Sequence, residues 1–452
     1  MDSLNKINRQ LSTTQVIALG FISAILIGAV VLSLPVSSAD GSFTPFIDSL
    51  FTSTTSVCVT GLVVVTTATH WSLFGKVVIL ILIQLGGLGI ISFTTGIMMV
   101  IGRRITLRDR MILEDALNLD TLKGLVRFLQ RIFKGTFMVE SIGAVCYSLV
   151  FIPQYGIIKG VWFSIFHSVS AFCNAGIDIL GENSLVPYVS NPWINIVTMG
   201  LIITGGIGFL VWWDITNNIK KMAQHEYTPK MAVKKLHIHS KIVIITTLCL
   251  VFGGALLIFA LEFNNPETIG NLSFFEKIQA SLFQSVVLRT AGFMTFSQAG
   301  MHGTSIIVCL FLMFIGGSSI STSGGIKTTT FSVLFLSTRA TIKGSPHLVV
   351  FNKTIPHKTV QKALAVTVVS FTALIIATFM LHLFEGGSLL DATFETTSAV
   401  ATVGLSRDFT ASMGIAGKII ITFCMYLGRI GPISMVIFFN RQQQGSRYFS
   451  YP

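Results

Sequence analysis

The chain has 452 residues, of which 52% are hydrophobic and only 11% are charged, and its mean hydropathy is +0.75. A soluble domain averages roughly 25% charged residues, so this composition excludes a surface that faces water over most of the molecule. The net charge of +12 would attract nucleic acid if it were gathered on one face, but its distribution along the chain, given below, excludes that function. The composition predicts a protein embedded in a membrane.

Eight apolar stretches are long enough to cross a bilayer, for which a helix needs roughly 20 residues. They are 14–35, 73–101, 131–152, 192–216, 241–262, 303–338, 360–384 and 415–440. The first follows a polar segment and is too long for a signal peptide, so we expect it to stay as a membrane helix. The sixth is interrupted in its middle, and the even number places both termini on one side of the membrane.

Four more apolar stretches are too short to cross and are typical of re-entrant helices. They are 45–58, 160–173, 275–288 and 389–402. Each lies between two spanning stretches and ends in a small polar loop with one glycine. These glycines, spaced 115, 116 and 112 residues apart, are Gly61, Gly176, Gly292 and Gly404.

A second glycine element follows in every unit, 25, 29, 24 and 24 residues after the loop glycine. It begins at Gly86, Gly205, Gly316 and Gly428. Two landmarks that keep their spacing through four units predict a fourfold internal repeat. In the first two units we expect the glycines of this element to serve close helix packing; they are Gly86, Gly89, Gly205 and Gly208.

The basic residues predict the topology. Of the 31 Lys and Arg, eight lie between Arg103 and Lys134, six between Lys220 and Lys241, and five between Arg339 and Lys362. The connections on the opposite side hold only five. Because loops rich in Lys and Arg stay in the cytoplasm, we expect both termini and these three loops there, and the excess charge reports topology.

Non-helical backbone is tolerated at membrane depth only where protein or a water-filled cavity surrounds it, because unsatisfied N–H and C=O groups are costly in lipid. Four such loops in one chain meet most economically around a common axis. Their carbonyl oxygens can then replace the hydration shell of a cation, as in potassium filters. Glycine accepts positive φ in such a loop, and the C-terminal end of a short helix adds a negative dipole end. The pattern predicts a pore for monovalent cations.

From about Thr13 to Phe439 the sequence resembles the Trk/Ktr/HKT superfamily of potassium transporters, and most closely its bacterial KtrB- or KtrD-type membrane subunit. The motifs that carry the resemblance are Gln84-Leu85-Gly86-Gly87-Leu88-Gly89, Ala171-Phe172-Cys173-Asn174-Ala175-Gly176, Arg289-Thr290-Ala291-Gly292-Phe293 and Gly428-Arg429-Ile430-Gly431-Pro432. The resemblance implies an all-α polytopic fold of four M1-P-M2 repeats, with eight transmembrane helices and four re-entrant pore helices around one pore. It also implies a K⁺-binding selectivity filter at Val59, Thr60, Gly61, Asn174, Ala175, Gly176, Thr290, Ala291, Gly292, Thr402, Val403 and Gly404.

The interruption of the sixth span is rich in small and hydroxyl residues, which make a poor helix. We expect an unwound, movable loop below the filter, and the superfamily has a gating loop at this position. Its residues are Gly316, Gly317, Ser318, Ser319, Ser321, Thr322, Ser323, Gly324, Gly325 and Lys327. A Walker A phosphate loop is not present, because Ile326 separates Gly325 from Lys327.

Charges inside a membrane are costly and usually functional. We expect Arg429 to act as a positive barrier in the pore and as an anchor of the gating loop. Arg289 precedes the third filter loop as a brace, and Glu395 hydrogen-bonds behind the fourth. Lys327 either contributes at the inner end of the loop or extends to the cytoplasm.

Isolated histidines and cysteines are expected to be structural. The histidines within or beside the apolar stretches are His70, His167 and His382, and the six cysteines, expected as buried free thiols, are Cys58, Cys146, Cys173, Cys249, Cys309 and Cys424. Neither set has the spacing of a metal site.

The predicted function is the ion-translocating subunit of a potassium uptake system in the bacterial cell membrane, with Na⁺ as a second candidate ion. The alternative is a secondary cation symporter with discontinuous helices, against which four parallel units and the lack of a convincing midplane acid argue. No catalytic motif emerges, so we expect no enzyme and no cofactor in this chain. The resemblance implies a homodimer and a cytosolic regulatory ring of KtrA-type subunits that carry any ATP or ADP.

The predicted division of the chain follows the repeats. It consists of a cytoplasmic N-terminus 1–13, repeats 14–101, 123–218, 240–338 with the gating loop 316–327, and 358–440, and a cytoplasmic C-terminus 441–452.

Overall fold

The computed structural model describes residues 13–100, 125–345 and 347–431. Several predicted features lie wholly or partly outside this range. They are the termini 1–13 and 441–452, the first basic loop up to residue 124 and the part of the last span beyond residue 431.

The regular elements of the described chain are helices, apart from one two-stranded hairpin between α16 and α17. The first half contains α2 (Thr13–Ser33), η1 (Pro35–Ser37), α3 (Phe46–Cys58), α4 (Thr67–His70), α5 (Leu73–Leu88), α6 (Ile90–Val100), α8 (Leu125–Tyr155), α9 (Ile157–Phe172), η2 (Val186–Tyr188), α10 (Pro192–Ile207), α11 (Phe209–Ala223) and α12 (Pro229–Lys235). The second half contains α13 (Ile238–Glu262), α14 (Phe274–Val287), α15 (Gly303–Phe314), α16 (Thr328–Ile342), β1 (Val349–Val350), β2 (Lys353–Thr354), α17 (His357–Glu385), α18 (Leu389–Val400), η3 (Thr410–Ser412) and α19 (Ile415–Ile430). The two strands pair antiparallel, with Val349 opposite Thr354.

Four long apolar helices form the periphery. Among the described residues, α2, α8, α13 and α17 are each long and apolar enough to cross a membrane, yet only 22–33% of their most apolar windows is buried. Their exposed side chains are largely apolar, for example Ile27, Met138, Leu256 and Phe379. An apolar surface of this extent requires lipid rather than water around it, so the chain is an integral membrane protein.

The four short helices α3, α9, α14 and α18 lie inside this periphery. Each contacts the long helix before it and one further helix. These further contacts join α3 to α19, α9 to α5, α14 to α10 and α18 to α15. Glycines in three of the long helices allow the short helices to pack closely against them. A methyl group on Gly28, Gly143 or Gly254 would lie 2.4–2.5 Å from a serine hydroxyl of α3, α9 or α14.

The helices in the stretches 73–101 and 192–216 are interrupted, and the sequence analysis did not predict these breaks. A single glycine separates α5 from α6 and α10 from α11, and the second pair is bent by 101°. The breaking glycines have φ of +82° at Gly89 and +94° at Gly208, and Gly431 ends α19 in the same way with +93°. This left-handed backbone stops a helix, and glycine adopts it without a steric penalty.

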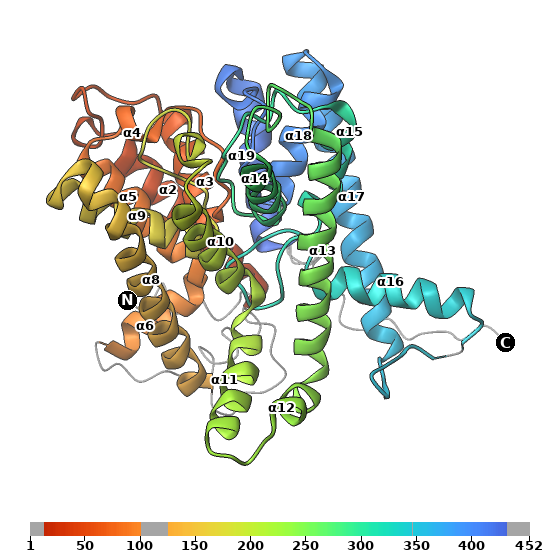
Figure 1. The fold of residues 1–452 in the computed structure, drawn as a ribbon. Coiled ribbons are helices and arrows are strands. Elements are labelled where there is room, and N and C mark those ends of the chain that lie inside the picture. Colours follow the sequence, from red (N-terminus) through yellow and green to blue (C-terminus); the bar gives the residue numbers. More distant parts are fainter. Residues whose placement is uncertain (1–12, 101–124, 346, 432–452) are drawn as a thin grey trace, which may run out of the picture.

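The longest break falls between α15 and α16, where residues 315–327 form no helix. In Figure 1, α16 runs sideways out of the bundle at a steep angle to α13, while α11 and α12 project from the bundle's lower end. The interruption predicted in the stretch 303–338 is therefore present. It is longer than the single-residue breaks at Gly89 and Gly208.

The glycines expected to serve helix packing divide into two kinds. A methyl group on Gly86 would lie 2.1 Å from Val57 O, and one on Gly205 would lie 2.0 Å from Phe172 O, so both pack against the last turn of a short helix. At Gly89 the prediction is wrong, because the nearest atom to an added methyl group is 3.8 Å away and the left-handed φ is what requires glycine.

The thiols follow their prediction with two exceptions. All six cysteines are free, and four of them are buried. Cys249 is exposed and Cys146 is half-buried, because both lie on long helices with one face turned toward lipid.

Candidate ion-conduction site

Each short helix ends in a strained turn. One residue within three positions of each helix end has a left-handed φ. These values are +56° at Val59, +59° at Asn174, +69° at Thr290 and +53° at Thr402. Such a φ is a genuine outlier for a β-branched residue and costs roughly 1–2 kcal/mol. Strain of this kind collects at functional sites, and here it falls at equivalent places on Val59, Thr290 and Thr402, while Asn174 adopts the same left-handed φ more readily.

Two residues further on, each turn reaches its glycine, and the glycines bring the turns together. A methyl group on Gly61 would lie 2.5 Å from Ala175 O, and one on Gly176 would lie 2.5 Å from Ala291 O. A methyl group on Gly292 would lie 2.9 Å from Val403 O, which joins the third turn to the fourth. One on Gly404 would lie 2.0 Å from Thr60 O, which joins the fourth turn to the first. The four turns therefore form a closed ring in which only glycine fits at these positions.

We call this arrangement the loop ring. Its members are the twelve buried residues 59–61, 174–176, 290–292 and 402–404. They are the residues that the sequence predicted as the filter, and the structure brings all of them together.

The backbone amides of the loop ring bond backward to the short helices. Thr60 N donates to Thr55 O at 2.9 Å, Ala175 N to Ser170 O at 2.8 Å and Val403 N to Ser398 O at 2.7 Å. With these donors turned away, the carbonyl oxygens of the ring remain free to face a cation, and among the described residues the hydroxyls of Thr60, Thr290 and Thr402 also have no hydrogen-bond partner. The C-terminal ends of four helices meet there as well, which adds negative potential, so the centre suits a cation.

Hydroxyl side chains support two of the turns, and sequence reasoning missed them. Gly61 N donates to Thr55 Oγ1 at 2.9 Å and Gly404 N donates to Ser398 Oγ at 3.0 Å. A hydroxyl residue six positions before the loop glycine was the available signal. The third turn differs, because Val286, six positions before Gly292, has no hydroxyl, and because Ala291 N bonds to Val287 O only four residues back.

The segment between α15 and α16, residues 315–327, lies directly against the loop ring; we call it the α15–α16 loop. Ser318 N donates to Gly206 O at 2.9 Å and Phe209 N donates to Ile320 O at 2.9 Å, so the loop docks on the break between α10 and α11. A methyl group on Gly324 would lie 2.0 Å from Thr402 Oγ1 of the ring.

Two cations of this region contact the α15–α16 loop. The half-buried guanidinium of Arg429 donates to Thr322 O and, at 2.6 Å, to Gly86 O. Lys327 Nζ donates to Ser323 O at 2.6 Å. Of the two alternatives for Lys327, the structure therefore has the side chain folded back onto the loop.

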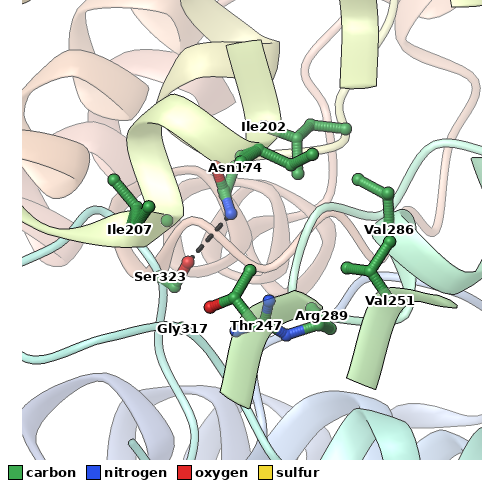
Figure 2. A pocket seen from close by; sticks show the side chains of 11 residues that line it. Asn174, Ile202, Ile207, Thr247, Val251, Val286, Arg289, Gly317 and Ser323 are labelled. Atoms are coloured by element: carbon green, nitrogen blue, oxygen red, sulfur yellow. Dashed lines mark hydrogen bonds between the residues drawn. The ribbon is translucent and has the colours of Figure 1, made fainter. Parts of the chain in front are cut away.

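Arg289 lies behind the third turn and donates to Gly316 O at 3.2 Å, at the start of the α15–α16 loop. Among the described residues its Nε and the hydroxyl of Thr247 have no hydrogen-bond partner. Both line a cavity with room for about one water molecule, and Figure 2 shows them with Asn174 and Ser323.

Buried carboxylates lie around the ring rather than in it. Glu395 accepts from Arg407 N at 3.1 Å and from Thr410 Oγ1 at 2.6 Å, and so holds the segment that follows the fourth turn. Glu140 of α8 is buried as well and accepts from Gln84 Nε2 at 3.3 Å. The sequence analysis expected no convincing acid at the middle of the membrane and did not single out Glu140, the one acidic residue of the stretch 131–152.

The histidines lie outside the ring. His70 Nε2 pairs with Thr44 Oγ1 at 3.0 Å. His167 is buried among aromatic rings, and its Nδ1 lies 2.7 Å from Phe163 O. These contacts are structural.

A bundle with a lipid-facing periphery and a buried ring of backbone oxygens defines a membrane protein of the ion-transporting class. The chain matches the family model TrkH, described as cation transport protein, over residues 8–451. The chain belongs to this family.

Individual relatives match over nearly the whole chain. Ktr system potassium uptake protein B of Bacillus subtilis is 40% identical over 432 residues, which cover 96% of this chain and 94% of the relative. Potassium/sodium uptake protein NtpJ of Enterococcus hirae is 38% identical over 451 residues, covering 98% and 97%. The solved potassium transporter TrkH of Vibrio parahaemolyticus has a TM-score of 0.72 and 18% identity, covering 95% of this chain and 86% of that one, a likeness of fold.

Proposed function

We propose that the chain is the ion-translocating subunit of a bacterial potassium uptake system and that K⁺ passes through the loop ring, which acts as its selectivity filter. The observation that carries the proposal is the closure of the ring, in which each glycine meets a carbonyl oxygen of the next turn. Backbone oxygens held in a ring replace the hydration shell of a cation. The names of the Bacillus and Enterococcus relatives support potassium as the ion, and the second name supports Na⁺ as an additional one.

The chain forms four M1-P-M2 repeats in this proposal, 14–101, 123–218, 240–338 and 358–440, with eight transmembrane helices and four re-entrant pore helices. The order of long helix, short helix, loop ring segment and interrupted helix supports it. The positive-inside rule places both termini in the cytoplasm of the bacterial cell.

The α15–α16 loop is the proposed gate. It lies against the ring and is held by backbone bonds to Gly205 and Gly206 and by the guanidinium of Arg429. Its conformation is not helical and contains a left-handed isoleucine, Ile320, with φ of +55°, so the loop can move without unwinding a helix. Arg429 then has two effects: it anchors the loop, and its positive charge opposes cations that approach the closed gate.

The partners follow from the family. We infer a homodimer and a cytosolic ring of KtrA-type regulatory subunits, on which ATP or ADP would bind. The exposed lysines of the α11–α12 segment, such as Lys230 and Lys234, are either the docking surface or determinants of topology.

The symporter alternative remains the weaker one, although the structure contains a buried acid that bears on it. Glu140 provides the buried acid that such a mechanism needs, yet it lies behind the second turn and bonds to Gln84 rather than to a pore-facing group. The closed ring of four turns favours a channel-like path.

The experiment is flux of K⁺, Rb⁺ and Na⁺ through the protein in proteoliposomes, comparing wild type with Gly292→Ser. The added side chain at φ +75° would begin 2.9 Å from Val403 O, so we expect a loss of K⁺ preference. Gly200→Ser is the matched control, because nothing lies within 4 Å of a side chain begun there. Unchanged selectivity and rate in folded Gly292→Ser would count against the filter.

A further inference from the structure

One side chain of the loop ring reaches out of it to the α15–α16 loop. Asn174 Nδ2 donates to Ser323 Oγ at 2.9 Å, and Asn174 Oδ1 accepts from Thr322 Oγ1 at 3.4 Å. Thr322 Oγ1 also lies 3.1 Å from Phe172 O in the last turn of α9. Figure 2 shows the amide of Asn174 pointing at Ser323, away from the apolar side chains of the neighbouring cavity. The second turn of the ring is therefore hydrogen-bonded through side chains to the loop below it.

The other three turns have no such link. Val59 is apolar, and the hydroxyls of Thr290 and Thr402 have no hydrogen-bond partner within the described ranges. The α15–α16 loop touches the fourth turn only by packing, where Gly324 lies against Thr402. A movement of the loop therefore acts on the second turn through a side chain of the ring itself, whereas by hydrogen bonding it reaches the third turn only through Arg289, which precedes that turn and donates to Gly316 O at 3.2 Å.

The link has a direct effect on backbone geometry. Asn174 is the left-handed residue of its turn, with φ of +59°, and all three residues of the turn are buried. A buried amide that loses its partners pays its full desolvation cost, so it shifts until it finds new ones. Because Ala175 O follows directly and lies against Gly61 of the neighbouring first turn, a shift of Asn174 displaces a carbonyl oxygen of the ring.

We propose that Asn174 is a positioning residue that makes ion selection in the loop ring depend on the position of the α15–α16 loop. While Ser323 and Thr322 hold the amide, the second turn keeps the geometry that favours K⁺. When the loop moves, the amide is released and the preference for K⁺ over Na⁺ falls. This inference rests on the proposed function, in which the ring is the filter and the loop is the gate.

The test compares K⁺ and Na⁺ flux through the full chain in proteoliposomes for Ser323→Ala, Asn174→Ala and the double variant. Ser141→Ala is the matched control, since the exposed hydroxyl of Ser141 bonds within the peripheral helix α8 to Phe137 O at 2.6 Å, away from the ring and the loop. Ser323→Thr keeps the hydroxyl and should rescue the effect. Elution volume and melting temperature establish folding, and Asn174→Leu, which has a similar volume but neither a donor nor an acceptor, replaces Asn174→Ala if that variant does not fold.

We expect each single variant to lower the K⁺/Na⁺ flux ratio about two- to tenfold, the range of one hydrogen bond, and the double variant to match Asn174→Ala. The control and Ser323→Thr should keep the wild-type ratio. An unchanged ratio in Ser323→Ala, or fold-changes that multiply in the double variant, would overturn the coupling. If Ser323→Ala raises the K⁺ and Na⁺ fluxes equally, the result supports the loop as the gate and contradicts the coupling. The Gly292→Ser experiment tests the filter separately.

Discussion

Gly404→Ala is the substitution that tests the loop ring most severely. Gly404 has φ of +92°, and an added methyl group would lie 2.0 Å from Thr60 O and 2.8 Å from Gly61 Cα. The left-handed backbone costs a non-glycine residue roughly 1–2 kcal/mol, and overpacking costs about 1–3 kcal/mol more. The combined penalty of about 2–5 kcal/mol corresponds to a factor between about 30 and several thousand in an equilibrium constant. Because Thr60 O must move, we expect K⁺ flux to fall at least tenfold.

The assay is K⁺ and Rb⁺ uptake into proteoliposomes, with the melting temperature as a measure of folding. Gly253→Ala in α13 is the matched control, since nothing lies within 4 Å of its added methyl group and alanine favours the helix. The overlap distances also predict an order, with Gly404→Ala most harmful, Gly61→Ala and Gly176→Ala intermediate at 2.5 Å, and Gly292→Ala mildest at 2.9 Å. Wild-type flux in folded Gly404→Ala, or the reverse order, would refute the ring as the conduction site.

Three further predictions concern the gate and the ion pair between α19 and α3. Deleting residues 318–323 should raise ion flux, because the segment against the ring is removed, and reduced flux in folded protein would contradict gating. Arg429→Gln should raise flux about tenfold or more, since bonds from a charged donor contribute about 1.5–3 kcal/mol each and those to Thr322 O and Gly86 O are lost; unchanged flux would remove Arg429 as the anchor. Lys418 Nζ lies 2.6 Å from Asp48 Oδ1 across the α19–α3 contact, so Lys418→Met should destabilise the protein by about 1–3 kcal/mol. Asp48→Asn added to Lys418→Met should recover part of the melting temperature, and no recovery would show that the pair is not coupled.

The short helices were predictable because their signals are local. The stretches 45–58 and 389–402 differ from α3 and α18 by no more than two residues at either end, since an apolar run of this length ends where a small polar turn with glycine begins. The long helices α13 and α17 followed from hydropathy for the same reason.

The breaks at Gly89 and Gly208 were not predictable, because one glycine in an apolar run is equally compatible with a continuous packed helix. The choice depends on what surrounds it. Gly208 lies against Ser319 O of a segment more than a hundred residues away, and Gly89 ends a helix whose last turn accepts bonds from Arg429. The role of Glu140 was missed for a similar reason, since its partner Gln84 comes from another unit.

The amino-acid sequence by itself determined that this protein lies in a membrane and that four short helices end in glycine turns, because hydropathy, charge bias and glycine spacing act over short distances. Only the tertiary structure decided which turns are neighbours, that the fourth closes on the first, and that Asn174 alone reaches the α15–α16 loop by a side-chain hydrogen bond among the described ring residues. These features depend on atoms brought together from opposite ends of the chain, and no local pattern encodes such distances.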